Sequence, residues 1–268
     1  MTTPLPLADW IEQLLPLARE AGRGVMQIYA GDFDVRGKAD ASPVTAADEL
    51  AEAIILAGLA RLAPALPVVA EEQAAAGHTP HIGERFWLVD PLDGTREFVN
   101  RNGEFTVNIA LIEQGRPVRG VVLVPVSGRL YAGAVGLGAF EQEATGPARR
   151  PITTRAVPLE GLTVLASRSH GDEPALQAWL DEQRARGQAI AGVHSAGSSL
   201  KLCLLAAGQG DAYPRFGRTM EWDIAAGHAV LAAAGGQVCA LDASVLRYGK
   251  PGFENPHFVA WGRVCTVS

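Results

Sequence analysis

Near the start of the chain, apolar residues recur at every third or fourth position, which is the period of an amphipathic helix. The pattern runs from Trp10 to Ile28. Asp9 and Glu12 have the spacing of a capping box that would begin this helix. Pro16 falls inside the pattern and predicts either a kink or a later start.

A second helical pattern covers residues 47–62, and Thr45 and Asp48 have capping-box spacing just before it. Two apolar runs follow at 68–70 and 86–89. Both are short enough to be buried strands, and both end at acidic residues. The first part of the chain therefore predicts two helices followed by strands with polar ends.

The remainder of the chain continues to alternate. Two runs separated by Gln114 and Gly115 predict a hairpin, and Gly235 with Gly236 ends the last helical pattern. We expect a layered α/β fold, an α+β sandwich of alternating helix and sheet layers. The predicted strands cover 105–112, 118–124, 131–140, 162–166, 189–194, 212–215, 238–241 and 258–261, and the predicted helices 174–186, 198–207 and 222–234.

Between residues 141 and 160 the sequence turns polar and contains prolines. We place a boundary there. It predicts an N-terminal α+β half over 1–150, with most of the acidic strand ends, and a C-terminal α/β half over 151–268. A chain of 268 residues can form one large domain or two small ones around a shared site.

Composition narrows the range of functions. Hydrophobic residues make up 48% and charged residues 19%, as in a soluble enzyme. The net charge of -6 and the pI of about 5.5 argue against binding a nucleic-acid polymer. An acidic site can still bind a small phosphorylated ligand if metal cations lie between them.

Three cysteines without paired spacing indicate a reducing compartment, so we expect a cytoplasmic protein. No apolar run approaches the roughly 20 residues of a transmembrane helix. Peripheral attachment to the inner membrane stays open.

The segment from Asp90 to Thr95, Asp-Pro-Leu-Asp-Gly-Thr, carries the most chemical information. A buried strand ends there in two carboxylates three residues apart, and Gly94 permits an unusual backbone angle. Asp90, Asp93 and the Leu92 carbonyl can surround one point, and all-oxygen ligands suit Mg²⁺ or Mn²⁺ better than zinc. The alternative is a plain turn, since Asp-Pro and Asp-Gly are both turn dipeptides.

Other acidic residues favour a metal site at this segment over a plain turn. Glu71 and Glu72 end a strand that we expect beside Asp90, because neighbouring parallel strand ends converge. Asp223 precedes an apolar helix, where a helix-dipole role is the alternative. Asp48 can likewise be only a capping acid.

Several ordered motifs resemble the inositol monophosphatase superfamily of metal-dependent, lithium-sensitive phosphatases, over nearly the whole chain. Within it, the chain most resembles the bacterial 3'(2'),5'-bisphosphate nucleotidases, which act on a by-product of sulfate assimilation. The matching segments are 38–48, 70–72, WLVDPLDGTREFVNRNGEFTVNIALI at 87–112, SRSH at 167–170, GSSLK at 197–201, YPRFG at 213–217 and EWDIAAGHAV at 221–230.

The resemblance implies specific roles. The catalytic group would be Asp48, Thr95 and Glu71, with Thr95 and Asp48 activating the attacking water. The metal ligands would be Glu71, Asp90, Leu92 through its carbonyl, Asp93 and Asp223. The substrate contacts would be Leu92, Asp93, Gly94, Thr95, Ser198, Lys201 and Asp223, with Ser199 nearby. Lys38, His170 and Arg215 are further candidates, each with a purely structural alternative.

The expected reaction is hydrolysis of 3'-phosphoadenosine 5'-phosphate to AMP and phosphate. The resemblance implies two or three Mg²⁺ ions, replaceable by Mn²⁺, with Li⁺ as an inhibitor, and it leaves a homodimer open. One alternative is an inositol 1-phosphate or other sugar-phosphate phosphatase. Another is a non-catalytic binding or regulatory protein on the same fold.

Overall fold

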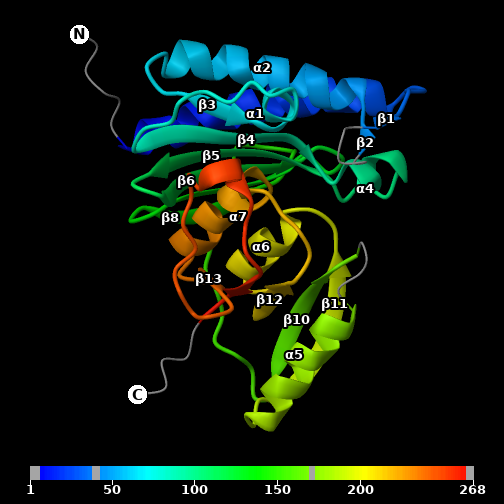
Figure 1. Cartoon of the computed structure of the whole chain (residues 1–268), viewed down its shortest axis with the longest axis vertical. Helices are drawn as coiled ribbons and strands as arrows, with labels where there is room; N and C mark the ends of the chain where they lie inside the picture. Colours follow the sequence, from blue (N-terminus) through cyan, green and yellow to red (C-terminus); the bar gives the residue numbers. More distant parts are fainter. Residues whose placement is uncertain (1–6, 38–42, 169–172, 264–268) are drawn as a thin grey trace.

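The computed structural model describes residues 7–37, 43–168 and 173–263. Its elements stack in alternating layers: two helices, a large sheet, two more helices, a smaller sheet and a last helix (Figure 1). This confirms the expected layered α/β fold. Lys38, His170 and Cys265 lie outside the described residues.

The large sheet has seven strands in the order β3-β4-β5-β6-β7-β8-β9. β3 and β4 run parallel, as predicted, and every later pair is antiparallel. The hairpin of β5 and β6 is confirmed. The bounds are β3 Val68–Ala70, β4 Arg85–Asp93, β5 Thr106–Glu113, β6 Arg116–Val124, β7 Arg129–Ala134, β8 Gly138–Gln142 and β9 Arg149–Ile152.

The strand predicted over 131–140 is in fact two strands, β7 and β8. Gly136 and Gly138 have φ of 85° and 95°, so the chain turns between them. β9 then extends the same sheet into the polar stretch. The large sheet therefore ends at Ile152, and the next begins at Leu162.

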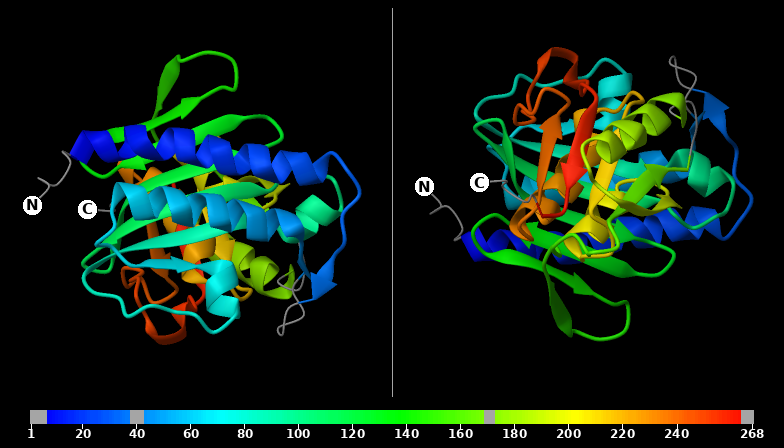
Figure 2. Two further views of the ribbon diagram at one scale, coloured as in Figure 1. Left: turned by 90° about the horizontal axis from the view of Figure 1, so that it is seen from above. Right: turned by 90° about the horizontal axis from the view of Figure 1, so that it is seen from below.

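Helices α1 (Leu7–Tyr29) and α2 (Ala46–Leu62) lie side by side across the outer face of the large sheet (Figure 2, left). The capping box of Thr45 and Asp48 is confirmed. The one predicted at Asp9 is wrong, because α1 already begins at Leu7 and Asp9 lies within it. Pro16 is exposed inside α1, which continues because its apolar face is buried against the sheet.

The smaller sheet has the order β11-β10-β12-β14-β13, with β10 parallel to β11 and β12. β14 is antiparallel to both of its neighbours. Its strands are β10 Leu162–Ser167, β11 Ile190–Ala196, β12 Ala212–Arg215, β13 Gln237–Ala240 and β14 Phe258–Trp261. The other elements are β1 Arg36–Gly37, β2 Pro43–Val44, α3 Glu71–Ala75, α4 Thr95–Val99, α5 Glu173–Ala185, α6 Leu200–Ala206, α7 Glu221–Ala233 and the 3-10 turn η1 Pro251–Phe253.

Helix α7 belongs to the later part of the chain but packs on the large sheet, against β5, β6 and β7. Two glycines allow the close approach. A Cβ at Gly120 would lie 2.2 Å from the Ala226 carbonyl oxygen, and one at Gly133 would lie 2.7 Å from the Val230 Cα. One apolar core thus includes residues from both sheets. The division at residue 150 stays a prediction.

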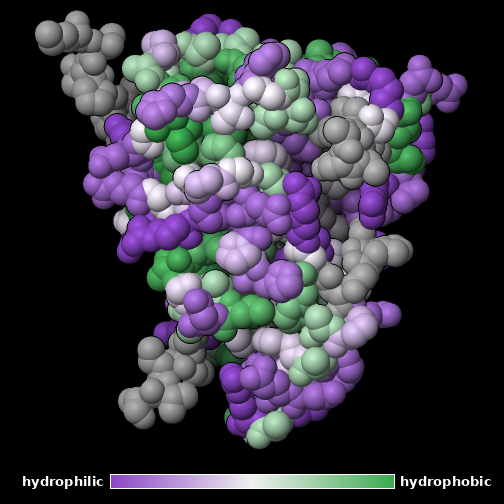
Figure 3. Space-filling view, viewed as in Figure 1, coloured by the Kyte–Doolittle hydropathy of each residue, from purple (hydrophilic) through white to green (hydrophobic). Residues whose placement is uncertain are grey.

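The surface is mixed. On the face shown in Figure 3, hydrophilic residues predominate over α5 and hydrophobic ones occur in small patches. Within the described ranges, no helix combines the length and apolarity needed to cross a bilayer.

Candidate active site

The end of β4 forms the core of the candidate site. Asp90 is 1% exposed, and its Oδ1 accepts a hydrogen bond from the Leu92 N–H at 3.0 Å. Asp90 pairs with Asn108 of β5 and Asp93 pairs with Thr106, so β4 carries one extra residue over this stretch. Such a bulge redirects the chain and lets both carboxylates end near one edge.

Gly94 follows with φ of 90° and precedes α4. A Cβ there would lie 3.2 Å from a Glu97 carboxylate oxygen and 3.4 Å from the Ser198 Cβ. The position therefore requires glycine for its backbone angle and has little room for a side chain.

Thr95 and Asp48 lie next to each other, although 47 positions separate them. The Thr95 hydroxyl is 3.3 Å from Asp48 Oδ1 and 3.3 Å from the Leu92 carbonyl oxygen. The other oxygen of Asp48 accepts hydrogen bonds from the N–H and the hydroxyl of Thr45, each at 2.8 Å. Asp48 is thus fixed by the start of α2 and still reaches Thr95.

Glu71 begins α3, directly after β3. Ala70 of β3 pairs with Val89 of β4, which places Glu71 one step beyond that pair, beside Asp90. Buried Glu52 of α2 supports this helix start by accepting hydrogen bonds from the main-chain N–H groups at positions 72 and 73, at 2.8 and 3.0 Å. Glu52 was not among the residues predicted from the sequence, because its partners in α3 lie 20 and 21 positions away along the chain.

Asp223 lies in the first turn of α7 and so belongs to the later part of the chain. Its Oδ2 accepts a hydrogen bond from the Met220 N–H at 2.8 Å. The carboxylate is therefore held by the backbone that begins its own helix.

The acidic residues influence one another. Burial raises the pKa of Asp93 to about 6, and the charges of Glu97 and Glu71 add to this, against Lys201 and the Ser199 N–H, which lower it. Burial raises the pKa of Asp223 well above its ordinary value, and Asp93 and Glu71 contribute. Because these carboxylates raise one another's pKa values, a cation near them would stabilise their charged forms.

In the part of the chain that the structure describes, no three Asp, Glu, His or Cys side chains are gathered tightly enough for a metal ion. The donor set itself fits a hard divalent cation, since it consists of carboxylates and a carbonyl oxygen. Bound metal would also offset the burial and the mutual repulsion that together raise the two pKa values.

The segment Gly197–Lys201 brings the second half of the chain to the site. The Ser199 N–H donates to Asp93, and its hydroxyl is 2.8 Å from Asn108 Oδ1. The buried Lys201 ammonium donates to the carbonyls of Ala196 and Ser198 at 3.0 and 2.6 Å. Burial lowers the pKa of Lys201 to about 8, against the nearby charge of Asp93.

These residues surround a cavity of 380 Å³. Asp93, Gly94, Thr95, Ser198, Lys201 and Asp223 line it, as does Arg215. The lining does not include Asp48, Glu71, Asp90 or Leu92. Other residues that line the cavity were not predicted as site residues, among them the polar side chains of Arg96, Glu97, Arg218 and Thr219. Arg96 and Glu97 follow Thr95 directly, and that adjacency could have identified them.

Residues 7–264 match the inositol monophosphatase family, and the chain belongs to it. A 3'(2'),5'-bisphosphate nucleotidase CysQ from Shigella flexneri is 47% identical over 251 residues, which cover 92% of this chain and 98% of that protein. The CysQ of Escherichia coli K12 is 46% identical with the same coverage.

Solved structures agree with this assignment. CysQ from Bacteroides thetaiotaomicron has a TM-score of 0.79 at 35% identity, with 96% of this chain and 98% of that chain covered. An inositol monophosphatase from Anabaena has a TM-score of 0.74 at 27% identity, with 96% and 91% covered.

Proposed function

We propose that this protein is a magnesium-dependent 3'(2'),5'-bisphosphate nucleotidase that converts 3'-phosphoadenosine 5'-phosphate to AMP and phosphate. The observation that carries the proposal is that Asp93, Thr95 and Asp223 line one cavity together with basic side chains. The similarity to CysQ proteins over 92% of the chain supports the same activity.

In this proposal Glu71, Asp90, the Leu92 carbonyl, Asp93 and Asp223 hold two or three Mg²⁺ ions. Mn²⁺ can replace Mg²⁺, and Li⁺ inhibits. When bound, the metal lowers the pKa of a water molecule and neutralises charge on the phosphate and on the leaving oxygen.

The protein's own groups then orient the reaction. The Thr95 hydroxyl, 3.3 Å from Asp48 Oδ1, can accept a hydrogen bond from the attacking water while passing its own proton toward Asp48. The N–H groups of Gly94 and Thr95 can bind phosphate oxygens and so stabilise the charge that develops on them. Glu71, which directly follows β3, is the third member of the catalytic group in this proposal.

Basic residues favour a substrate with a second anionic group. Arg96, Lys201, Arg215 and Arg218 all line the cavity that contains the acidic site. An inositol monophosphate has no second phosphate for these charges, whereas a bisphosphate nucleotide does. Ser198 lies among them and can contact the sugar.

The test is phosphate release with Mg²⁺ from 3'-phosphoadenosine 5'-phosphate and from inositol 1-phosphate, measured side by side. We expect a higher kcat/KM for the nucleotide and no turnover in an Asp90→Asn control. Preference for the inositol ester would overturn the substrate but keep the chemistry. No release from either ester would favour a binding protein on this fold.

We also propose that the protein acts in the cytoplasm on a small phosphorylated substrate and that it can attach peripherally to the inner membrane. We propose in addition that the chain can form a homodimer. Light scattering of the purified protein, and its sedimentation with inner-membrane vesicles, test the two statements separately.

A further inference from the structure

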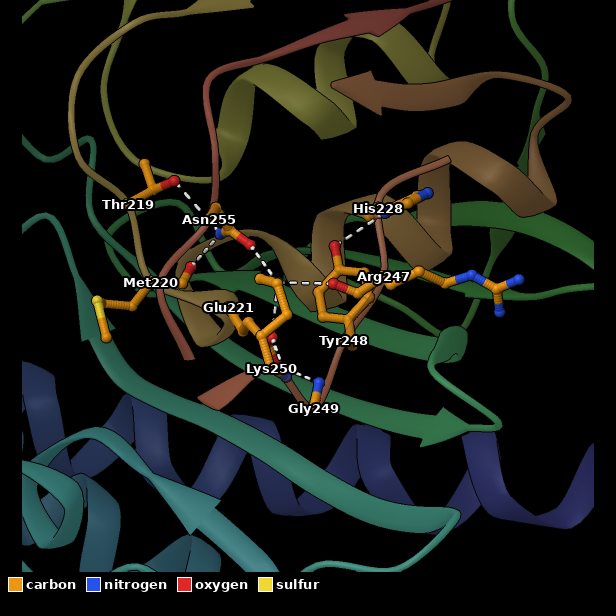
Figure 4. A network of polar contacts seen from close by, with 9 residues as sticks. All are labelled: Thr219, Met220, Glu221, His228, Arg247, Tyr248, Gly249, Lys250 and Asn255. Carbon is orange, nitrogen blue, oxygen red and sulfur yellow. Dashed lines mark hydrogen bonds and ion pairs between the residues drawn. The ribbon is translucent and has the colours of Figure 1, made fainter. Parts of the chain in front are cut away.

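An ion pair between buried Glu221 and partly exposed Lys250 lies at the start of α7 (Figure 4). Neither residue lines the cavity. Glu221 is the first residue of the helix and its side chain is 0% exposed. Its carboxylate accepts hydrogen bonds from the Gly249 N–H at 2.7 Å, the Lys250 N–H at 2.9 Å and the Lys250 ammonium at 2.6 Å. The loop before β14 is thus hydrogen-bonded to the first residue of α7.

Lys250 uses its whole ammonium group in this network. A lysine ammonium has three N–H donors. They point to Glu221 at 2.6 Å, to the Arg247 carbonyl at 2.6 Å and to Asn255 Oδ1 at 3.2 Å. The ammonium therefore has no donor left for a substrate, and its contact with Asn255 determines which way that amide faces.

Asn255 connects Lys250 to the residues just before α7 through hydrogen bonds. With Oδ1 turned to Lys250, its Nδ2 donates to the Met220 carbonyl at 2.7 Å and to the Thr219 hydroxyl at 3.3 Å. Its own N–H donates to the Thr219 carbonyl at 2.9 Å. Met220 and Glu254 also pair as an isolated β-bridge. The loop therefore holds the backbone on both sides of the helix start.

That backbone carries Asp223. The Met220 N–H donates to the Asp223 carboxylate, so a shift of Met220 moves the carboxylate with it. The middle of α7 is already fixed on the large sheet through the close approach at Gly120 and Gly133. The first turn, which extends beyond that contact, is instead fixed by the Glu221–Lys250–Asn255 network.

Burying a charged group costs desolvation free energy, so stability alone does not explain why a charged pair occupies this position. Well-packed apolar residues of similar volume are often as stable or more so, while loss of one partner leaves a buried charge. What a pair with three directed donors adds is a defined position for the groups it joins. Groups that orient metal ligands from outside typically change metal affinity or activity by about 10- to 100-fold when removed.

We propose that Lys250, Glu221 and Asn255 form a positioning network that sets the Asp223 carboxylate against Asp90 and Asp93 for magnesium binding. The inference rests on the proposed function, since it takes Asp223 as a metal ligand. None of the three residues touches the substrate in this proposal.

The test compares three full-length variants with the wild type: Lys250→Met, the double variant Glu221→Gln/Lys250→Met, and Arg186→Met as a matched control. Arg186 forms an exposed ion pair with Glu182 on α5. The Mg²⁺ Kd is measured by calorimetry on the folded proteins, and kcat and KM for 3'-phosphoadenosine 5'-phosphate are measured at saturating and limiting Mg²⁺. Thermal unfolding is recorded without metal.

We expect Lys250→Met to raise the Mg²⁺ Kd about 10-fold or more, with KM at saturating Mg²⁺ nearly unchanged. The double variant removes the unpaired charge and should recover thermal stability, but its Kd should stay raised because Asn255 is no longer oriented. Arg186→Met should match the wild type in every measurement.

Two results would overturn the positioning role. One is a lower Tm with a wild-type Mg²⁺ Kd, in either Lys250 variant, which indicates support of the fold alone. The other is a double variant that does not fold, since the network would then be required for folding itself. If the wild type binds no Mg²⁺, the proposed function fails first, and that result is distinct from both.

Discussion

The main-chain N–H of Ser199 donates a hydrogen bond to the carboxylate of Asp93, although 106 positions separate the two residues. Asp93 ends β4 of the large sheet, and Ser199 precedes α6. The Ser199 hydroxyl meanwhile contacts Thr106 and Asn108 of β5, at 2.9 and 2.8 Å. The second half of the chain is thereby connected to the acidic edge of the first sheet at a buried point.

Asp93 is expected to reduce stability while it supports function. Its pKa rises from 3.8 to about 6, mainly through burial. A raised carboxyl pKa contributes stability below pH 4 that is lost as the pH rises through 6. Without metal at pH 8, Asp93→Asn should therefore raise Tm, by about 2–4 °C per kcal/mol recovered. Activity with Mg²⁺ should fall by about 10² or more.

Calorimetric scans of both proteins at pH 8 and pH 4.5 test this prediction. The Asn side chain can still accept from the Ser199 N–H, so the substitution mainly removes charge. The gain in Tm should shrink at pH 4.5, where Asp93 is protonated. An equal gain at both pH values would contradict the assigned cause.

The Thr95 hydroxyl is expected to matter for turnover and not for metal affinity. It lies 3.3 Å from Asp48 and contributes no carboxylate. Thr95→Ala should lower kcat by about 10², the scale found for other positioned polar groups. Thr95→Ser keeps the hydroxyl and should retain most of the activity. A Thr95→Ala enzyme of normal kcat, or a Thr95→Ser enzyme as slow as Thr95→Ala, would exclude the role.

Local patterns in the sequence were sufficient for most of the fold. The capping box of α2 and the short apolar runs of β3 and β4 depend only on neighbouring residues. The convergence of Glu71 with Asp90 followed because parallel strands end at one edge. The segment from Asp90 to Thr95 indicated that β4 ends in a turn with carboxylates, but it did not predict the bulge between Asp90 and Asp93.

Contacts between distant segments could not be predicted in this way. Glu52 reaches the start of α3, and Lys250 reaches the start of α7, only because the sheets bring those segments together. Nothing near Lys250 in the sequence indicates its partner. The capping box predicted at Asp9 failed for a related reason: the spacing was correct, but packing on the sheet lets α1 begin earlier.

His228 should make the wild type sensitive to mild acid. It is buried in α7, its Nδ1 lies 2.8 Å from the Tyr248 hydroxyl, and burial lowers its pKa from 6.5 to about 3. A depressed pKa contributes stability above 6.5 that is lost as the pH falls toward 3. From pH 7.5 to 5.5 the wild type should lose about 1.4 kcal/mol more free energy of unfolding than His228→Gln.

Urea unfolding of the two metal-free proteins at these pH values gives the difference directly. Other acidic groups titrate in both proteins and cancel in the comparison. Equal losses in the two would show that His228 takes up its proton in the folded state at the same pH as in the unfolded chain.

Gly120 should be intolerant of even one added methyl group. It lies in β6 under α7, where a Cβ would meet the Ala226 carbonyl oxygen at 2.2 Å. That neighbour is backbone, so relief requires the helix itself to move. Gly120→Ala should therefore lower the free energy of unfolding by about 3 kcal/mol, at the upper end for overpacking. Since α7 carries Asp223, the Mg²⁺ Kd should rise as well.

The matched control is Gly83→Ala, because a Cβ at Gly83 has nothing within 4 Å. It should change stability by no more than about 0.5 kcal/mol, as for most surface substitutions. Urea unfolding and magnesium titration of both variants decide the point. A lower stability with an unchanged Mg²⁺ Kd would mean that the strands of the sheet shift to accommodate the added methyl group while α7 stays in position. A lower stability together with a raised Mg²⁺ Kd would mean that the packing of α7 on β6 determines the position of Asp223.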